Sequence, residues 1–319
     1  MRRWSTDGAG TGFYRWQAAP RSSKAKPALK TCFIANPRSG HTAPRLPELT
    51  TRVRHLGAEL RLTDHSGHAR ELAAAAVREG CRTVVAVGGD GTVNEVAGAL
   101  AGTDATLGIL PAGSGNGLAR HLGIHGSWSR ALGILAAGHT RALDAGSADG
   151  HPFFAVAGVG FEALLAERFN RARRRGLAAY ALIVLRSLQS AHPLPVRIHA
   201  AGKTWTLPVV TLAVANSSQY GGGARIAPHA RTDDGLLDLC ALPPLRPGNF
   251  LGLTWRLLAG RIDRAPGVLC LQGAEFTVER PGKGPLHTDG EVHAAGGAVR
   301  FTVAPARVRV LCPPEQANR

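Results

Sequence analysis

A glycine-rich turn set directly between a buried strand and a helix constrains the fold of this chain more than any other feature. Residues 84–87 read Val-Val-Ala-Val, which is typical of a strand buried on both faces, and Gly88-Gly89-Asp90-Gly91 follows at once. A helix is predicted directly after the turn, over residues 92–100. Glycines let backbone N–H groups approach an anion, and a helix N-terminus adds partial positive charge. The sequence therefore predicts a phosphate-binding turn at the end of a strand.

The same alternation of strand and helix runs through the first part of the chain. The predicted strands are 31–35, 59–63, 83–87 and 106–110, and the predicted helices are 46–56, 68–79, 92–100 and 118–122. Near-continuous apolar strands that alternate with helices indicate a parallel sheet covered by helices. We therefore expect an α/β domain over residues 29–141.

The pattern changes near residue 141, after which strand-like segments dominate. They are residues 153–157, 196–200, 205–214, 236–241, 268–271 and 275–279. Gly, Pro and Asp turns separate them, as in an antiparallel β-sandwich, so a second domain is predicted over residues 142–299. One basic helical stretch, roughly 163–188, interrupts it. The final strands, 299–303 and 307–311, are expected to return to the first domain and complete it with residues 300–312. Residues 1–28 lack periodicity and are predicted to be a disordered leader.

The charge balance is strongly basic, with 38 Lys and Arg against 22 Asp and Glu and a formal net charge of +16. Such a surface attracts polyanions, although arginine also serves simply to keep a chain in solution. Nucleic acid is not expected as a partner, because basic and aromatic residues do not interleave and no helix-turn-helix signature is present.

A basic cluster precedes the apolar residues 177–188. It consists of Arg171, Arg173, Arg174 and Arg175. A basic stretch beside apolar surface is suited to an anionic membrane, and the alternative is a solvated helix face.

The longest apolar run is too short to span a bilayer, and the N-terminus lacks the apolar core of a signal peptide. The scattered cysteines form no CxxC pair and fit a reduced compartment. We therefore expect a cytoplasmic protein that contacts anionic membranes peripherally.

Two further turns follow predicted strands in the same way as the first. Residues 36–40 and 113–117 would lie beside residues 88–92 at the carboxyl edge of the sheet, where open α/β sheets bind ligands. Three small-residue turns meeting there would form one phosphate cradle. The chain has no GxxxxGK[ST] motif, which excludes a P-loop nucleotidase.

Three polar residues in or just after the central turn have two possible interpretations each. Asp90 beside phosphate would bind Mg²⁺ or accept a proton, or it is an ordinary Asp-Gly turn residue. Thr92 and Glu95 have the spacing of a capping box, in which each side chain satisfies a backbone donor of its own helix.

Six segments together resemble the diacylglycerol kinase catalytic domain family. They are residues 36–40 (Asn-Pro-Arg-Ser-Gly), 88–92 (Gly-Gly-Asp-Gly-Thr), 111–116, 157–162, 234–238 and 289–291 (Asp-Gly-Glu). The order and spacing are similar to those of the soluble bacterial YegS-like lipid kinases, which are related to sphingosine kinases, and the resemblance covers roughly residues 29–312. It implies a nucleotide-binding α/β domain, a β-sandwich domain for the lipid substrate, and an active site in the cleft between them.

The resemblance also implies which residues contact ATP. They are Asn36, Pro37, Arg38, Ser39, Gly40, Thr63, Gly89, Asp90, Gly91, Thr92, Val93, Asn94, Glu95 and Ser114. Ser114 replaces the commoner threonine and keeps its hydroxyl. Gly117 replaces an acidic residue frequent in the bacterial diacylglycerol kinases, and the resulting Gly-Ser-Gly-Asn is more similar to sphingosine kinases.

Catalysis and metal binding are likewise implied by the resemblance. In the family the glutamate at the position of Glu291 accepts the proton of the lipid hydroxyl, with the aspartate at Asp289 beside it. Together with Asp90 these are the expected catalytic residues. Asp234 would bind a structural Mg²⁺ with the backbone carbonyls of Arg231 and Leu236, or it belongs to a plain Asp-Gly turn.

The resulting expectation is an ATP-dependent, Mg²⁺-dependent kinase that phosphorylates a hydroxyl of diacylglycerol, a sphingoid base or a related lipid. Two alternatives remain open. An NAD kinase shares the glycine turn and the Asn94-Glu95 pair, and a non-catalytic nucleotide-binding or nucleic-acid-binding protein would use the basic charge.

Overall fold

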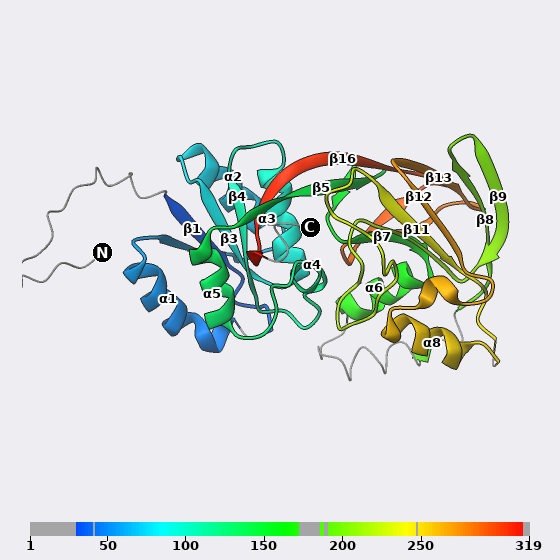
Figure 1. The fold of residues 1–319 in the computed structure, drawn as a ribbon, viewed down its shortest axis with the longest axis horizontal. Coiled ribbons are helices and arrows are strands. Elements are labelled where there is room, and N and C mark those ends of the chain that lie inside the picture. Colours follow the sequence, from blue (N-terminus) through cyan, green and yellow to red (C-terminus); the bar gives the residue numbers. More distant parts are fainter. Residues whose placement is uncertain (1–29, 41, 172–185, 188–190, 247, 315–319) are drawn as a thin grey trace, which may run out of the picture.

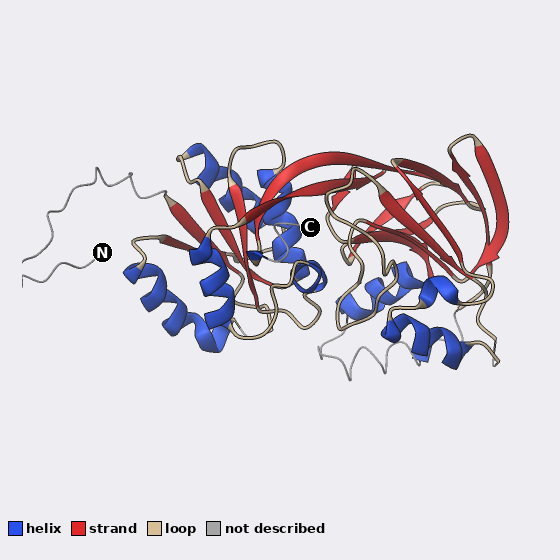
Figure 2. Cartoon of the chain, viewed as in Figure 1, coloured by secondary structure: helices blue, strands red, loops and turns tan. Residues whose placement is uncertain are grey.

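Two β-sheets organise the chain in the computed structural model, which describes residues 30–40, 42–171, 186–187, 191–246 and 248–314 (Figure 1, Figure 2). The predicted leader lies outside these residues, as does the basic cluster from Arg173 to Arg175. No helix among the described residues is both long and apolar enough to cross a bilayer.

The first sheet begins with four parallel strands in the order β2-β1-β3-β4. Their bounds are Thr31–Ala35 (β1), Glu59–Leu62 (β2), Thr83–Gly88 (β3) and Thr106–Pro111 (β4). β1, β3 and β4 are almost wholly buried, which explains their continuous apolar sequences.

Helices flank these parallel strands on both sides (Figure 1). They are Leu46–His55 (α1), His68–Arg78 (α2), Asp90–Leu100 (α3), Gly117–His121 (α4) and Trp128–Ala137 (α5), and a short 3₁₀ turn, Ala43–Arg45 (η1), precedes α1. The predicted strands and helices of this region are confirmed within one or two residues. The prediction missed α5, although Ser127 caps its N-terminus and Gly138 ends it in the left-handed conformation.

One long strand carries the first sheet into the second half of the chain. β16 (Ala298–Leu311) pairs in parallel with β4 and antiparallel with β5 (Thr140–Ala148). Two separate strands were predicted here. The pairing instead continues past a register shift between Ala304 and Val308, where Pro305 lacks an N–H for the ladder.

The sheet is completed on the far side of β16 by antiparallel strands. They are Glu275–Glu279 (β13), Leu194–Ala200 (β8), Lys203–Val209 (β9) and, paired with β5, His151–Phe153 (β6).

The second sheet is antiparallel and runs β12-β11-β10-β7-β14-β15. Its strands are Val156–Gly160 (β7), Thr211–Ala215 (β10), Leu237–Leu242 (β11), Leu269–Gly273 (β12), Gly284–Thr288 (β14) and Glu291–Ala295 (β15). Phe276 and Phe301 of the first sheet share a buried cluster with Val159, Leu212 and Leu239 of the second. This face-to-face packing confirms the predicted β-sandwich.

Two predicted strands are each divided in the structure. Segment 153–157 breaks between β6 and β7, because the N–H groups of Phe154 and Ala155 donate to the Asp289 carboxylate rather than to a strand. Segment 205–214 breaks at Val210, where the chain passes from β9 in one sheet to β10 in the other.

The remaining helices cover the sandwich part of the chain. α6 (Phe161–Arg171) follows β7, and the rest of the predicted helix up to residue 188 lies largely outside the described residues. The prediction missed α8 (Phe250–Ala259), which precedes a 3₁₀ turn at Ile262–Arg264 (η3).

Candidate active site

Three glycine turns meet at the carboxyl edge of β1, β3 and β4, as the sequence predicted. A Cβ on Gly40 would lie 2.4 Å from the carbonyl oxygen of Ala112, and one on Gly113 would lie 2.5 Å from the Cα of Gly89. Real Cβ atoms do not approach backbone so closely, so the three turns pack only because these residues lack side chains. The result is a concave surface of backbone at the N-terminus of α3, which suits an anion.

Asp90 lies at the first position of α3, where the glycine turns meet. Its Oδ1 accepts the N–H of Gly117 at 2.7 Å. Burial first, and then the negative charge of Asp289, raises the pKa of Asp90 from an ordinary 3.8 to about 6. A partly desolvated carboxylate near a second one is electrostatically unfavourable without a cation, and carboxylate oxygen is the ligand type that Mg²⁺ prefers.

The close packing around position 117 explains why a glycine stands there. A Cβ there would lie 2.5 Å from the carbonyl oxygen of Tyr220. The neighbouring Asn116 adopts the left-handed conformation and pairs with Gly221 in an isolated bridge. The loop after β10 therefore packs directly against the third turn.

Asp289 is the most densely hydrogen-bonded carboxylate of the described site. Its Oδ2 accepts the Asn94 side-chain amide at 2.7 Å and the N–H of Phe154 at 2.8 Å. Its Oδ1 accepts the N–H groups of Ala155 and Val156, both at 2.9 Å. Asn94 belongs to α3, so this side chain connects the β14–β15 turn to the helix that begins at the glycine turns.

The β14–β15 turn presents Glu291 as the first residue of β15. The turn residues Asp289 and Gly290 have φ angles of 49° and 89°, and Thr288 pairs with Glu291 across the hairpin. Glu291 is exposed, two residues from the anchored Asp289. The resemblance led us to expect this segment at a cleft between the two domains. The Asn94–Asp289 hydrogen bond joins it to α3, the helix that begins at the glycine turns.

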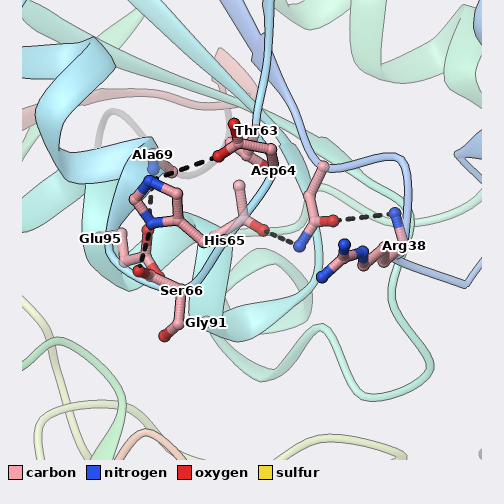
Figure 3. Close-up of a pocket in the computed structure, with 10 residues that line it drawn as sticks. Arg38, Thr63, Asp64, His65, Ser66, Ala69, Gly91 and Glu95 are labelled. Atoms are coloured by element: carbon pink, nitrogen blue, oxygen red, sulfur yellow. Dashed lines mark hydrogen bonds and ion pairs between the residues drawn. The ribbon is translucent and has the colours of Figure 1, made fainter.

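A pocket of about 230 Å³ opens beside the glycine turns (Figure 3). Six of its lining residues were predicted as ATP contacts: Asn36, Arg38, Thr63, Gly91, Thr92 and Glu95. Asn36 holds the first turn, because its Oδ1 accepts the backbone N–H of Arg38 and its Nδ2 donates to Thr92 Oγ1. Four lining residues were not predicted, namely Asp64, His65, Ser66 and Ala69, and all follow β2 in the chain. Their position after a strand of the sheet was the available signal.

The other predicted ATP contacts lie around the pocket rather than in its lining. Ser39 is buried against Gly89, and Val93 is buried in the core. Asn94 is directed to Asp289, and Ser114 is exposed on the third turn.

The capping box predicted for Thr92 and Glu95 is wrong. α3 begins at Asp90 with Gly89 as its N-cap, so Thr92 is already inside the helix. Glu95 instead accepts the N–H groups of Gly67 and Ala69, at 2.9 and 3.0 Å, and so satisfies donors at the N-terminus of α2. Sequence spacing alone does not reveal a cap supplied by a different helix.

Three side chains near the mouth of the pocket lie within metal-ligand distance of one another. Asp64 Oδ1 is 2.6 Å from His68 Nδ1 and 3.3 Å from His65 Nε2, and the two imidazoles stack. Ion pairing and stacking are sufficient to explain this cluster.

The predicted structural metal residues lie in the loop before β11. Asp234 Oδ1 accepts the N–H of Leu236 at 3.1 Å, and the side chain of Arg231 is directed to Asp233. Asp238 lies nearby, and burial together with the charge of Asp234 raises its pKa to about 6. Among the described residues its buried Oδ2 has no hydrogen-bond partner. An unpartnered carboxylate oxygen beside a second carboxylate fits a hard cation.

Comparison with known proteins assigns the two halves of the chain. Residues 30–148 match the model of the diacylglycerol kinase catalytic domain, and residues 155–312 match that of the YegS C-terminal NAD kinase beta sandwich-like domain. A diacylglycerol kinase of Mycobacterium tuberculosis is 33% identical over 296 residues, which cover 89% of this chain and 95% of the relative. A protein of Pseudomonas aeruginosa named as a YegS-like lipid kinase is 35% identical over 266 residues, covering 82% and 87% of the two chains.

Solved structures share the fold at lower sequence identity. A diacylglycerol kinase from Bacillus anthracis superposes with a TM-score of 0.67 at 19% identity, over 90% of this chain and 98% of that one. An NAD kinase from Archaeoglobus fulgidus in complex with ATP superposes with a TM-score of 0.54 at 12% identity, over 90% and 96%.

Proposed function

The chain belongs to the diacylglycerol kinase catalytic domain family of lipid kinases, and we propose that it transfers the γ-phosphate of ATP to a hydroxyl of a membrane lipid. Diacylglycerol and sphingoid bases are the substrate classes that we propose. The observation that carries this proposal is the Asn94–Asp289 hydrogen bond, which holds the β14–β15 turn against the helix of the glycine turns. A carboxylate two residues farther on, Glu291, is thereby kept close to where phosphate would bind.

The nucleotide would bind in the pocket of Figure 3, with its phosphates at the glycine turns. Backbone N–H groups at the start of α3 and the Arg38 side chain would interact with the phosphate oxygens. Gly40, Gly89 and Gly113 allow this close approach because they have no Cβ. Thr63 and Ser114 would contribute hydroxyl groups at the edges of the site.

Asp90 is the residue that would hold the catalytic Mg²⁺. Its carboxylate is half-buried near that of Asp289 and accepts the Gly117 N–H through Oδ1, whereas both oxygens of Asp289 already accept N–H donors. When bound, the cation would offset the negative charge of the phosphates. Asp289 then acts as a positioning residue rather than as a metal ligand.

Glu291 is the proposed general base. The lipid hydroxyl oxygen forms a bond to the γ-phosphorus, the bond from this phosphorus to the β–γ bridging oxygen breaks, and ADP leaves. The hydroxyl proton passes to the Glu291 carboxylate. An exposed position on a hairpin turn lets this carboxylate reach a hydroxyl presented from outside the protein.

The acceptor is tested with γ-labelled ATP and a panel of diacylglycerol, ceramide, a sphingoid base and NAD. The proposal expects label in one or more of the lipids and none in NAD. Label in NAD alone would contradict it and would favour the activity of the fold's more distant neighbour. We also propose that Asp234 binds a structural Mg²⁺ together with the backbone carbonyls of Arg231 and Leu236.

A further inference from the structure

Helix α8 exposes an apolar stripe to solvent. Leu251, Trp255 and Leu258 have exposed fractions of 76%, 57% and 60%, and their spacing of four and three residues aligns them on one face. They are three of the five large apolar side chains exposed among the described residues, and the other two, Leu56 and Leu62, lie apart on the nucleotide-binding half.

The opposite face of α8 already has its packing partner. Leu253 is buried in the core, and Leu257 is partly buried and packs against the same core. The helix is therefore apolar on two sides, and only one is needed to attach it to the fold. α8 lies at the lower side of the sandwich half in Figure 1, and the exposure of Leu251, Trp255 and Leu258 leaves its outer face open to a large partner.

Arginines are frequent in and next to α8 along the chain. Residues 244–266 contain Arg246, Arg256, Arg261 and Arg264, and their one acidic residue, Asp263, lies 3.5 Å from His229. Arg225 joins the group, because its side chain packs beside Gly260 at the end of the helix. Arg225, Arg246, Arg261 and Arg264 are exposed, and none of them forms an ion pair with an acidic group in the described part of the chain.

An apolar stripe with tryptophan and a basic margin has the composition of a helix that lies in a membrane interface. Leucine inserts below the headgroups, tryptophan prefers the interface itself, and each arginine near anionic lipid contributes roughly 1 kcal/mol. Two copies of this chain meeting through α8 would bring arginine against arginine, which opposes self-association. The net charge of +16 favours an anionic surface in the same way.

We propose that the outer face of α8 docks the protein on a bilayer of anionic phospholipid. The inference rests on the proposed function only in explaining why such docking is useful, since a kinase must reach a substrate that resides in the membrane. Leu251, Trp255 and Leu258 supply the inserted surface, and the neighbouring arginines supply the preference for anionic headgroups.

Sedimentation with vesicles tests the proposal without any need for activity. The full chain is mixed with vesicles of phosphatidylglycerol and phosphatidylcholine in equal parts, or of phosphatidylcholine alone. We expect binding to the anionic vesicles that weakens with salt. The double variant Leu251→Ser/Leu258→Ser should bind at least about tenfold more weakly. The matched control Leu56→Ser/Leu62→Ser removes two exposed leucines elsewhere and should bind as the unaltered chain does.

Tryptophan fluorescence adds a local readout on the same vesicles. Burial of Trp255 in the interface should shift its emission to the blue, and the shift should be absent in Trp255→Phe. Equal binding by the two double variants would overturn the proposal. So would a dimer of the unaltered chain that Leu251→Ser/Leu258→Ser dissociates, because α8 would then be an interface between copies. Vesicle binding by a chain that phosphorylates no lipid would leave the docking surface standing and reject the proposed function.

Discussion

At the scale of single residues, the two half-buried aspartates of the site differ in their surroundings. Asp90 has a raised pKa and accepts the N–H of Gly117, whereas Asp289 accepts four N–H donors that include a side-chain amide of α3. A carboxylate held by that many donors is fixed in place and is a structural connection as much as a chemical group. The sequence predicted both residues as catalytic but could not show this difference, because the donors to Asp289 lie some 135 to 195 residues away in the chain.

Asp90→Asn should greatly lower turnover and yet raise the free energy of unfolding of the protein without ligand. Turnover should fall at least about 100-fold, because the site loses the charge that would hold the cation. The folded-state pKa of about 6 lies above the ordinary 3.8, so the ionised carboxylate destabilises the fold at neutral pH. Removing it should raise the free energy of unfolding at pH 7 by up to about 3 kcal/mol.

The pH dependence of this stabilisation shows whether the ionised Asp90 carboxylate causes it. Stability of the unaltered protein should decline as the pH rises from about 4 to about 6, while that of Asp90→Asn should not. The difference between the free energies of unfolding of the unaltered protein and of Asp90→Asn should therefore vanish below pH 4. Chemical denaturation across this range measures it, and Asp104→Asn at an exposed position provides the control. A destabilised Asp90→Asn at pH 7 would contradict the electrostatic explanation.

Asp289→Asn should loosen the β14–β15 turn. The amide retains one acceptor oxygen and turns an NH₂ group toward backbone donors, and each donor left unsatisfied costs about 1–3 kcal/mol. The amides of Phe154, Ala155 and Val156 should then exchange hydrogen faster, and kcat should fall. The pKa of Asp90 should also drop, because a neighbouring negative charge is gone. Unchanged protection of those three amides would exclude the positioning role.

At the scale of elements, the sequence predicted the α/β half well because its strands and helices are specified locally. β1, β3 and β4 are continuous apolar runs, and each ends in a turn rich in small residues. The sandwich half was predicted less completely. β14 contains Gly284 and Pro285, which conceal its strand character, and the break between β6 and β7 depends on the distant Asp289.

Gly113→Ala tests the convergence of the glycine turns. The new methyl would lie 2.5 Å from the backbone of Gly89, so the turns must separate. We expect the Kd for ATP to rise at least about tenfold, measured by calorimetry. The control is Gly133→Ala in α5, where a methyl meets no atom within 4 Å and should stabilise the helix by about 0.5–1 kcal/mol. Equal ATP binding by both variants would reject the phosphate cradle.

Asp234→Ala tests the proposed structural cation in the loop before β11. Mg²⁺ without nucleotide should raise the Tm of the unaltered protein, because a ligand of the folded state stabilises it. The variant should lose this response, and the pKa of Asp238 should fall when the charge of Asp234 is removed. A Tm of the unaltered protein that is the same with Mg²⁺ and with a chelator would rule the site out.

At the scale of the whole molecule, the two halves are joined in more ways than the sequence suggested. β16 belongs to one continuous sheet that spans both halves, and Asn216 links the loop after β10 to the carbonyl groups of Asp144 and Phe154. Contacts within the protein itself thus hold the two halves of the site together. The sequence motifs identified most of the residues of the site. The contacts between those residues join distant parts of the chain, and local residue patterns do not predict such contacts.

The most direct test of this description is the rate of lipid phosphorylation by Glu291→Gln. The amide keeps the shape of the side chain and cannot accept the hydroxyl proton, so kcat should fall roughly 100-fold or more. ATP affinity and Tm should be unchanged, because Glu291 is exposed. Glu279→Gln, at a half-buried glutamate of β13 that lies 3.4 Å from His199, should retain full activity. Full activity of Glu291→Gln on a lipid that the unaltered protein phosphorylates would contradict the assignment of Glu291 as the base and, with it, the proposed arrangement of the site.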